Sequence, residues 1–429
     1  MFRWPINMKV KKIAFFTLGC RLNQFETDSL AGQFLSAGYK IVNFDKEADA
    51  YVINTCSVTG KSDRKSRNII NRAKNRKAVT IVTGCFAESS RKELESSGVT
   101  FVVGNPQKQN IFKLLDNYFN NIKHDREIGP PGVFDFPAST VFHTRGLVKI
   151  QDGCNNFCSF CIIPFLRGRA VSRDPKSVLL GVKESLSQGI KEISLTGVNI
   201  GRYHYENVTF SKLVEDIISL PGEFRLRIPS LEPDNLDRRL VELFANPKLG
   251  RHLHLCLQSG SDRILGLMRR NYTYTDFLIF TQKIRGEYPL FNFTTDIMTG
   301  FPGETDEDFK KTLDSITEIN FGHVHTFPYS KRKMTKAAKM PDQIPEKIKK
   351  ERAELVRETS EIEKQKYREK LIGSEDLVLI EDLKNTARGY GSYYAPIEFK
   401  TQSAKANTFR RVIISGLRKP ELFLKAELI

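Results

Sequence analysis

Short apolar runs alternate with helix-like stretches over the first 120 residues. Three of these runs are rich in β-branched or aromatic residues and lead directly into a cysteine: residues 13–18 before Gly19-Cys20, residues 50–55 before Cys56, and residues 79–84 before Cys85. A fourth run, residues 99–103, is closed by Gly104-Asn105-Pro106. Strand-like runs that alternate with helices are typical of parallel α/β structure. The pattern predicts an open parallel α/β sheet over residues 8–128.

The three cysteines of this region occupy equivalent positions in the predicted sheet. Ligands of open parallel sheets bind beyond the carboxyl ends of the strands. Cys20, Cys56 and Cys85 all fall there, so we expect them to meet at one edge, where they could hold a three-thiolate metal cluster. The alternative is that they are three buried structural cysteines, which are common.

Six further strand-like runs follow, at residues 146–150, 191–195, 224–228, 252–257, 292–298 and 322–327. Helical patterns separate them at residues 175–188, 210–220, 235–245, 274–287 and 305–319, and a charged helical stretch follows at 342–371. Six β/α repeats predict a partial (β/α)6 barrel with active residues at the carboxyl ends of its strands. We assign this domain and its connecting helix to residues 140–371, after a Pro- and Gly-containing linker at 125–139.

The last segment, residues 372–429, changes to short strands at 376–381, 393–399, 409–415 and 422–428. This spacing predicts a small antiparallel β-barrel. The barrel sequence mixes cations with tyrosines, a composition suited to RNA: Arg388, Tyr390, Tyr393, Tyr394, Lys400, Lys405, Arg410 and Arg411. The alternative is ordinary sheet aromatics beside exposed cations.

Charge and cysteine content narrow the class of protein. The 429 residues include 67 Lys and Arg against 50 Asp and Glu, a net charge of +17, which favours a polyanionic partner such as nucleic acid. The stretch 61–77 carries eight cations against Asp63 alone. Seven cysteines, an odd number, argue against a closed disulfide framework and fit a reducing, cytoplasmic location. No apolar run approaches the ~18 residues of a membrane span, so we expect no membrane partner.

Three more cysteines lie within eight residues, at Cys154, Cys158 and Cys161, with the spacing C-x3-C-x2-C. Thiolates this close can converge on one metal centre, and cysteine is the usual ligand of iron–sulfur clusters. Three thiolates leave the fourth iron of a cubane open. The alternative is a zinc site completed by His143 or Cys256, although zinc sites usually show paired C-x2-C units.

Other strand ends of the predicted barrel supply candidates for cofactor binding. They are Thr196, Gly197 and Asn199 after the second strand, Glu232 after the third, Gln258 after the fourth, and Asp296 and Gly300 on the fifth. Glycines there would let the backbone approach a ligand closely. Each segment alone could equally be a turn followed by a helix cap. Arg167 and Arg169 could face a carboxylate or phosphate, whereas His252 and His254 are expected to be core or lining residues and not ligands.

The spacing C-x3-C-x-aromatic-C, with Phe160 at the aromatic position, resembles the motif of radical S-adenosylmethionine (SAM) enzymes. The whole order resembles the methylthiotransferase family of that superfamily. The matching segments include Leu18-Gly19-Cys20-Arg21-Leu22-Asn23-Gln24-Phe25-Glu26, Asn54-Thr55-Cys56-Ser57-Val58-Thr59, Thr83-Gly84-Cys85, and Ile162-Ile163-Pro164 with Arg167-Gly168-Arg169. Asp63-Arg64-Lys65-Ser66-Arg67 is most similar to the branch that acts on N6-threonylcarbamoyladenosine in tRNA. The family pattern Ser-x-Arg-x-Gly-Thr also recurs from Ser330, with Met334 in place of its glycine.

The resemblance implies three domains, of which the last is a TRAM barrel, and two [4Fe–4S] clusters. Cys154, Cys158 and Cys161 would hold the cluster that cleaves SAM, and Cys20, Cys56 and Cys85 an auxiliary cluster that carries the sulfur. The product would be a methylthio group on C2 of N6-threonylcarbamoyladenosine at position 37 of tRNA. Isopentenyladenosine and a ribosomal-protein aspartate are the substrates of similar but less close branches. The implied partners are SAM, a tRNA anticodon stem-loop and a flavodoxin- or ferredoxin-like electron donor, and we expect a monomer.

Two other classes remain open at this point. One is a radical SAM enzyme that modifies a protein side chain, and the other is a nucleic-acid-binding protein with a structural metal. Salt-dependent RNA binding would argue against the first. Iron content would argue against the second, because structural zinc brings no iron.

Overall fold

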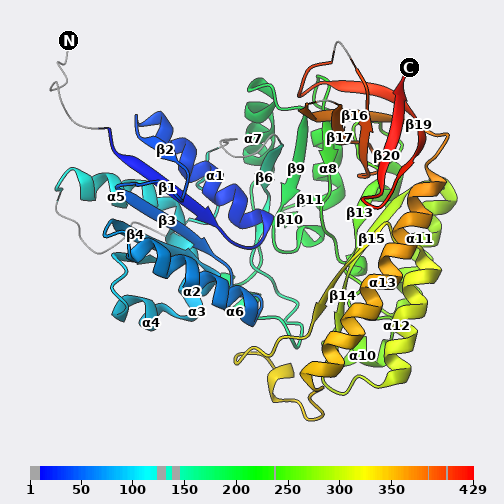
Figure 1. Cartoon of the computed structure of the whole chain (residues 1–429), viewed down its shortest axis with the longest axis horizontal. Helices are drawn as coiled ribbons and strands as arrows, with labels where there is room; N and C mark the ends of the chain where they lie inside the picture. Colours follow the sequence, from blue (N-terminus) through cyan, green and yellow to red (C-terminus); the bar gives the residue numbers. More distant parts are fainter. Residues whose placement is uncertain (1–9, 123–131, 138–144, 236–237, 385, 402–403) are drawn as a thin grey trace. The chain divides into compact units, whose positions relative to one another are not determined.

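The computed structural model describes residues 10–122, 132–137, 145–235, 238–384, 386–401 and 404–429 (Figure 1). The chain forms two compact units, described separately below. The first comprises the chain up to residue 143 with residues 152–154 and 162–169, and the second comprises 144–151, 155–161 and 170–429. Most of the predicted linker, 125–139, lies outside the described residues. Within the described ranges, no helix has the length and apolar character needed to cross a bilayer.

The first unit contains one parallel sheet with the strand order β2-β1-β3-β4-β5. Its strands are β1 (Lys12–Thr17), β2 (Lys40–Val42), β3 (Ala50–Thr55), β4 (Val79–Gly84) and β5 (Phe101–Val103). Its helices are α1 (Arg21–Ser36), α2 (Gly60–Lys74), α3 (Cys85–Ser89), α4 (Arg91–Ser96), η1 (Asn105–Asn110), α5 (Ile111–Phe119) and α6 (Ile163–Arg167). The predicted parallel sheet is confirmed. Strand β2 was not predicted, because it is a partly exposed edge strand of which only Ile41 and Val42 are apolar.

The second unit contains six parallel core strands in two groups. Their orders are β6-β9-β12 and β13-β14-β15, and isolated bridges from Leu226 to Leu249 and from Leu231 to Leu255 link the two groups. The strands are β6 (Gly146–Lys149), β9 (Glu192–Thr196), β12 (Arg225–Arg227), β13 (His252–His254), β14 (Asn292–Thr299) and β15 (His323–Pro328). All six predicted strands are present, which confirms the partial barrel.

Helices cover the outer side of these strands and close one large apolar core, while Ile264 and Met268 belong to a second, smaller apolar cluster. They are α7 (Pro175–Ser187), α8 (Phe210–Ile218), α9 (Arg238–Leu243), α10 (Asp262–Met268), α11 (Tyr274–Glu287) and α12 (Asp306–Ile319). Short elements lie in the connections: β7 (Gln151–Asp152), β8 (Val171–Ser172), β10 (His204–Tyr205), β11 (Val208–Thr209), η2 (Ile200–Arg202), η3 (Pro233–Asn235) and η4 (Ala337–Lys339).

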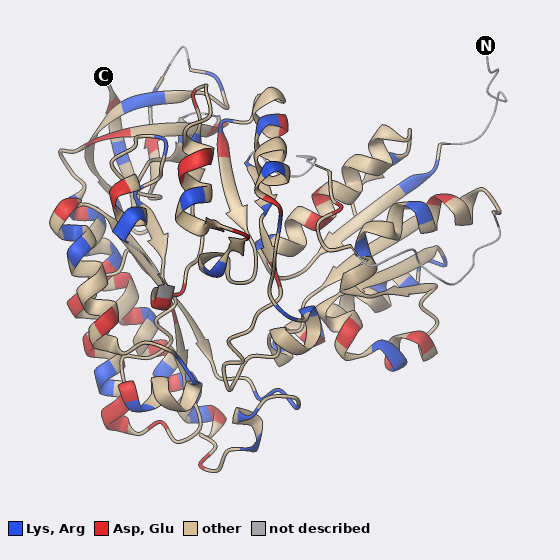
Figure 2. Cartoon of the chain, turned by 180° about the vertical axis from the view of Figure 1, so that it is seen from behind, with Lys and Arg blue, Asp and Glu red and all other residues tan. Residues whose placement is uncertain are grey.

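The connecting helix α13 (Glu346–Lys370) packs along β15 and α12 (Figure 1). The sequence of this helix has apolar residues at near-helical spacing, which predicts one buried face; of these, Val356 and Tyr367 are buried, but Leu355 and Ile362 are exposed. The helix instead buries polar groups: Ser360 Oγ accepts a hydrogen bond from the Val324 N–H on β15 at 3.0 Å. Elsewhere charges of both signs are interspersed along the helices of this unit, as Figure 2 shows. The periodicity thus predicted the helix correctly and its buried face only in part.

The last strands form a closed barrel in the order β16-β17-β18-β20-β19. They are β16 (Glu375–Leu383), β17 (Ala387–Tyr390), β18 (Pro396–Phe399), β19 (Phe409–Arg418) and β20 (Phe423–Leu428). The prediction of an antiparallel barrel needs one correction, since β18 and β20 pair in parallel. Strand β17 was missed because Gly389 interrupts its pattern. A Cβ there would lie 1.8 Å from the Leu379 carbonyl oxygen, so the close approach of β16 requires glycine.

Two buried arginines on β12 join the barrel to the core strands. Arg225 donates to the backbone carbonyls of Leu377 on β16 and of Tyr390 on β17. Arg227 donates to the Gly391 carbonyl at 2.8 Å. Each bond ties a core strand to the backbone of the barrel, so the barrel position does not depend on barrel side chains alone.

The carboxylate of Glu192 on β9 balances this positive charge. It lies 2.7 Å from Arg227 Nε, 3.3 Å from Arg225 Nη1 and 3.0 Å from Arg145 Nε. Burial opposes ionisation of the carboxyl, but the three guanidinium groups outweigh it and hold the pKa of Glu192 below its usual value. One fully buried carboxylate is thus shared by three guanidinium groups, of which Arg145 also pairs with Glu381.

Replacement of Glu192 by Gln should strongly destabilise the second unit. The substitution keeps the side-chain shape but leaves the buried guanidinium groups of Arg225 and Arg227 without their anion, which typically costs about 3–5 kcal/mol. Denaturant-induced unfolding measures the loss. Glu223→Gln is the matched control, because Glu223 is 66% exposed and 3.8 Å from Lys191, and it should change stability by no more than about 0.5 kcal/mol. Equal losses in both variants would contradict the role assigned to Glu192.

Candidate metal centres and cofactor site

Cys20, Cys56 and Cys85 follow three adjacent parallel strands of the first unit. Cys20 precedes α1 after β1, Cys56 follows β3, and Cys85 begins α3 directly after β4. Because β1, β3 and β4 are neighbours in the sheet, all three thiols lie at its carboxyl edge. The structure therefore brings together the three cysteines that the strand pattern placed at one edge.

Two glycines allow this edge to close. Gly19 has φ +98°, and a Cβ there would lie 2.9 Å from Cys56 Sγ. Gly84 has φ +94°, and a Cβ there would lie 2.3 Å from the Thr55 carbonyl oxygen. Both positions combine a left-handed backbone with contact to the next strand end, which glycine alone accepts without strain. Gly19 and Gly84 thus allow the backbone before Cys20 and Cys85 to pack closely against the end of the neighbouring strand.

The pKa values of the two buried thiols are shifted by burial and by the neighbouring cysteines. Burial raises the pKa of the Cys56 thiol, and Cys20 adds to the effect. Burial also raises the pKa of Cys85, while Arg167 opposes the shift and Cys20 and Cys56 reinforce it. A metal that binds such thiols replaces their protons. One exposed and two buried thiols at the same sheet edge fit the open-sided site that a three-thiolate [4Fe–4S] cluster requires.

A buried network of charges lies beside these thiols within the first unit. Lys108 Nζ donates to a carboxylate oxygen of Glu26 and, at 3.1 Å, to Asn54 Oδ1. Arg167 donates to Glu26 at 3.2 Å and to Asp152 at 3.0 Å. Burial disfavours both cations. It lowers the pKa of Lys108, whereas Asp152 and Glu26 keep the pKa of Arg167 above its usual value. The two cations and two anions of this network carry no net charge. Lys108 and Arg167 can therefore lie buried near the thiols without an uncompensated positive charge.

The loop with the C-x3-C-x2-C spacing is divided between the two units. In the first unit, the Cys154 N–H donates to the Gly168 carbonyl at 3.1 Å. In the second, Ser159 anchors the loop to α10 through the Leu267 and Met268 carbonyls. The Ser159 carbonyl also accepts from the Ala337 N–H at 2.8 Å, which ties the loop to the segment around Met334.

Arg270 is the buried cation beside this cysteine loop in the second unit. Its Nη1 lies 3.3 Å from Cys158 Sγ and 2.8 Å from Glu232 Oε1. Burial opposes its charge, but Tyr272, Glu232 and Cys158 hold the pKa of Arg270 well above its usual value. A fixed guanidinium next to a cysteine sulfur favours the thiolate, the form that binds iron. Sequence reasoning did not single out Arg270, because nothing in Arg269-Arg270-Asn271 marks it as buried.

Two predicted cofactor residues have buried amide atoms that find no hydrogen-bond partner within the described ranges. Asn199 is buried, and both its Oδ1 and Nδ2 lack a hydrogen bond among the described residues. Gln258 is buried with φ +69°, and its Oε1 is likewise unpaired within the described part of the chain. Buried amides are normally hydrogen-bonded, so their polar atoms are placed to meet a ligand. Asn199 and Gln258 therefore fit a polar cofactor such as SAM.

The other predicted cofactor residues have structural partners. Gly197 has no room for a side chain, since a Cβ would lie 2.8 Å from the Gln151 carbonyl oxygen, and a Cβ on Gly300 would meet Lys349. Glu232 holds Arg270 and Asn156. Thr196 is buried at the end of β9, and Phe160 packs against an apolar cluster around Met298 and Phe301. Their packing explains these residues whether or not they touch a cofactor.

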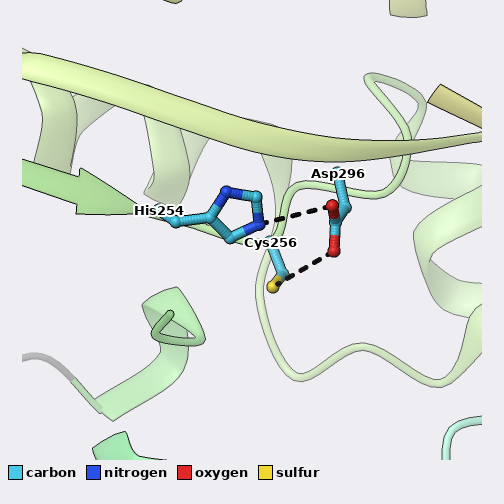
Figure 3. A group of neighbouring side chains, drawn as sticks. All are labelled: His254, Cys256 and Asp296. Carbon is cyan, nitrogen blue, oxygen red and sulfur yellow. Dashed lines mark hydrogen bonds and ion pairs between the residues drawn. The ribbon is translucent and has the colours of Figure 1, made fainter. Parts of the chain in front are cut away.

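The predicted residue Asp296 belongs to a group that sequence reasoning missed. It lies on β14 beside His254 and Cys256 (Figure 3). His254 is paired with Asp296, 3.4 Å from Nε2 to Oδ1. Burial favours the neutral ring, but Asp296 and Cys256 raise the pKa of His254 to about 10. The missed signal is the alternation His252-Leu253-His254-Leu255-Cys256-Leu257, in which the leucines are fully buried and the polar side chains share the other face.

The helix α2 presents part of its positive charge to solvent. Arg67 is paired with Glu93 and Arg72 with Asp45. Lys61, Arg64 and Lys65 are exposed, and they form no ion pair within residues 10–122.

The tyrosines of the barrel differ from expectation. Tyr393 is buried, and Tyr390 and Tyr394 stack 5.0 Å apart beneath Arg145. For these tyrosines the alternative of ordinary sheet aromatics is the better description.

Two family models match the chain. Residues 12–104 match Uncharacterized protein family UPF0004, and residues 148–316 match the Radical SAM superfamily. Together they span more than half of the sequence and coincide with the two sets of cysteines.

Curated relatives match over most of their length. The chain is 38% identical to "Threonylcarbamoyladenosine tRNA methylthiotransferase MtaB" of Aquifex aeolicus, covering 86% of this chain and 92% of the relative. It is 40% identical to the protein of the same name from Bacillus subtilis, with 79% and 78% covered. A "tRNA-2-methylthio-N(6)-dimethylallyladenosine synthase" of Syntrophus aciditrophicus is 33% identical, with 89% and 86% covered.

A solved structure shows the same fold at low identity. The radical SAM methyltransferase TsrM from Kitasatospora setae, with cobalamin and a [4Fe–4S] cluster bound, aligns with a TM-score of 0.58 at 14% identity, over 77% of this chain and 74% of that one. The two family models, the extent of the curated matches and the gathered thiols agree. The chain belongs to the tRNA methylthiotransferase family of radical SAM enzymes, which use SAM and [4Fe–4S] clusters.

Proposed function

We propose that this enzyme adds a methylthio group to C2 of N6-threonylcarbamoyladenosine at position 37 of tRNA. The observation that best supports this proposal is that Cys20, Cys56 and Cys85 lie at one edge of the sheet. They could form a second three-thiolate site, in addition to the loop of Cys154, Cys158 and Cys161. Four relatives named for the threonylcarbamoyl substrate are 34–40% identical. Relatives named for the dimethylallyl substrate are 33–34% identical, which makes that substrate the second candidate.

Each set of cysteines has its own task in this proposal. Cys154, Cys158 and Cys161 hold the cluster at which SAM is cleaved, and Cys20, Cys56 and Cys85 hold the auxiliary cluster. When bound, these cofactors supply the radical and the sulfur, while the protein orients them and excludes water. Arg270 keeps positive charge beside Cys158, and Arg167 does so beside Cys85. The C2–H of an adenine ring has no useful acidity, so radical activation suits this position.

The SAM site in this proposal lies at the carboxyl ends of the core strands in the second unit. Asn199 and Gln258 supply unpaired amide atoms to the cofactor. Thr196, Gly197, Glu232, Asp296 and Gly300 shape the surrounding loops, and Phe160 fixes the cysteine loop. Loop glycines with tight surroundings hold the backbone where a ligand can approach it.

The remaining assignments concern partners and organisation. We assign the anticodon stem-loop to the exposed cations of α2 and of the barrel, because unpaired loop bases can be splayed out for modification. We further propose a flavodoxin- or ferredoxin-like electron donor, a monomeric enzyme and a cytoplasmic location. The domain division proposed is 8–128, 140–371 and 372–429.

Mass analysis of tRNA nucleosides tests the substrate. In a host that lacks this activity, expression of the chain should convert N6-threonylcarbamoyladenosine into a product heavier by one methylthio group in place of hydrogen. The Cys20→Ala variant should not produce it. Methylthiolation of isopentenyladenosine instead would move the enzyme to the second candidate, and an unchanged nucleoside profile would refute both.

Iron analysis tests the two cluster sites separately. The reconstituted enzyme should bind roughly eight iron atoms per chain, as expected for two cubanes. The triple variant Cys154→Ala, Cys158→Ala and Cys161→Ala should retain about half of the iron, on Cys20, Cys56 and Cys85. Cys256→Ala is the control and should keep the full amount. A triple variant without iron would remove the auxiliary site.

Salt-dependent binding tests the RNA surface of α2. Replacement of Lys61, Arg64 and Lys65 by Gln should weaken binding to an anticodon stem-loop. The slope of log affinity against log salt should also become shallower, by roughly 0.7–0.9 for each phosphate that the variant no longer neutralises. Lys310→Gln, Lys311→Gln and Lys347→Gln form the matched control, since each of these exposed cations is paired with a carboxylate on its own helix. Equal effects of both triple variants would exclude a specific role for α2.

A further inference from the structure

His254, Cys256 and Asp296 converge at the carboxyl end of β13. Side chains two residues apart on an extended chain point to the same face, so His254 and the Cys256 that follows β13 lie on one side. Asp296 reaches them from the adjacent strand β14, which pairs in parallel with β13 through His254 and Thr294. Figure 3 shows the imidazole, the thiol and the carboxylate turned toward one another. Three different ligand types thus come from two neighbouring strands.

The distances among the ligand atoms suit a small metal ion. His254 Nε2 lies 3.4 Å from Asp296 Oδ1, and Cys256 Sγ lies 4.0 Å from Asp296 Oδ2. One ligand atom from each residue lies within 4.8 Å of the other two. Tetrahedral zinc has bonds of about 2.0–2.3 Å, so its ligand atoms lie roughly 3.3–3.7 Å apart. Side-chain shifts of less than about 1 Å would therefore complete such a site.

Neighbouring hydroxyl groups hold two of the ligands in place. The other imidazole nitrogen, His254 Nδ1, lies 3.0 Å from Thr294 Oγ1, which leaves Nε2 directed at Asp296. Ser230 Oγ lies 3.4 Å from Cys256 Sγ. Metal-binding histidines are usually oriented by a hydrogen bond on the second ring nitrogen. This arrangement is already present around His254.

Charge and burial select the class of ion. A thiolate and a carboxylate supply two negative charges, which a divalent cation neutralises. Nitrogen, sulfur and a single carboxylate match zinc-like ions, whereas magnesium and calcium require oxygen ligands. The His254 side chain is 12% exposed and that of Asp296 28% exposed, so one side of the group remains open. Three protein ligands with one open position are the pattern of catalytic zinc sites.

We propose that His254, Cys256 and Asp296 form a third metal site, which binds one zinc-class divalent cation and leaves a coordination position open. The site is distinct from the six cysteines assigned to the clusters, and it does not depend on the tRNA substrate. It lies on the strand edge that also carries Gln258, so the bound ion faces the region where the cofactor residues lie.

Zinc K-edge X-ray absorption on the enzyme with both clusters assembled tests the site. Zinc added to that enzyme should bind at one ion per chain, with one sulfur ligand at about 2.3 Å and the remaining nitrogen or oxygen ligands at about 2.0–2.2 Å. Cys256→Ser should remove the sulfur signal, and His254→Asn should weaken zinc binding more than tenfold, because loss of even an outer hydrogen-bond partner costs about 10–100-fold. Ser219→Ala is the matched control and should keep both the sulfur ligand and the affinity, because this exposed hydroxyl donates to the Glu215 carbonyl of its own helix.

Iron content and thermal unfolding, measured on each sample, separate loss of the site from loss of the fold. The variants should retain the iron and melting temperature of the parent. Zinc bound by sulfur alone would place it on cluster cysteines and overturn the proposal. So would zinc binding unchanged by Cys256→Ser and His254→Asn, or the absence of binding, which would leave His254 and Asp296 as an ion pair only.

Discussion

Parallel strand pairing is the constraint on which the chemistry of this chain depends. Cys20, Cys56 and Cys85 are separated by about thirty residues each, and no local force draws them together. Parallel pairing of β1, β3 and β4 does so, because every carboxyl end then falls on one edge. The same rule operates in the second unit, where Asn199, Gln258 and the group around His254 lie at or near the ends of parallel strands. A slip of one residue in register would turn these side chains to the opposite face.

Buried ion pairs are the second feature that both units share. Glu26, Lys108, Asp152 and Arg167 are all nearly inaccessible, as are Glu192, Arg225 and Arg227. Burial of such ions is expensive, and pairing repays that cost only when the geometry is good. Their value here is positional. Arg167 is held beside the thiols of the first unit, and Arg225 and Arg227 hold the barrel backbone against the core strands, so neither contact could be replaced by apolar packing of similar size.

Periodicity predicted the main strands and helices well, because long parallel strands carry strong β-branched runs and the intervening helices are amphipathic. It failed where an element is short or is defined by a partner, as for β2 and for β17 with its central Gly389. It also could not assign roles to buried polar residues. Nothing in the local sequence distinguishes Arg270, which contacts Cys158, from Arg269. His254 was not expected to be a ligand, because its partner Asp296 lies about forty residues further along the chain. The cysteine motif was the exception, because Cys154, Cys158 and Cys161 lie within eight residues and their spacing alone indicates a metal centre.

The attachment of the barrel has a consequence for selectivity. Tyr390 contacts Arg145, Tyr394 contacts Arg145 and Arg227, and Tyr393 is buried, so these rings offer little free face to nucleobases. The exposed cations of the barrel include Lys400, Lys405 and Arg411. Such groups grip any ribose–phosphate chain without reading it. If the barrel contacts tRNA as proposed above, it would add affinity without base specificity, and selectivity among tRNAs would come from the fit of the modified nucleoside.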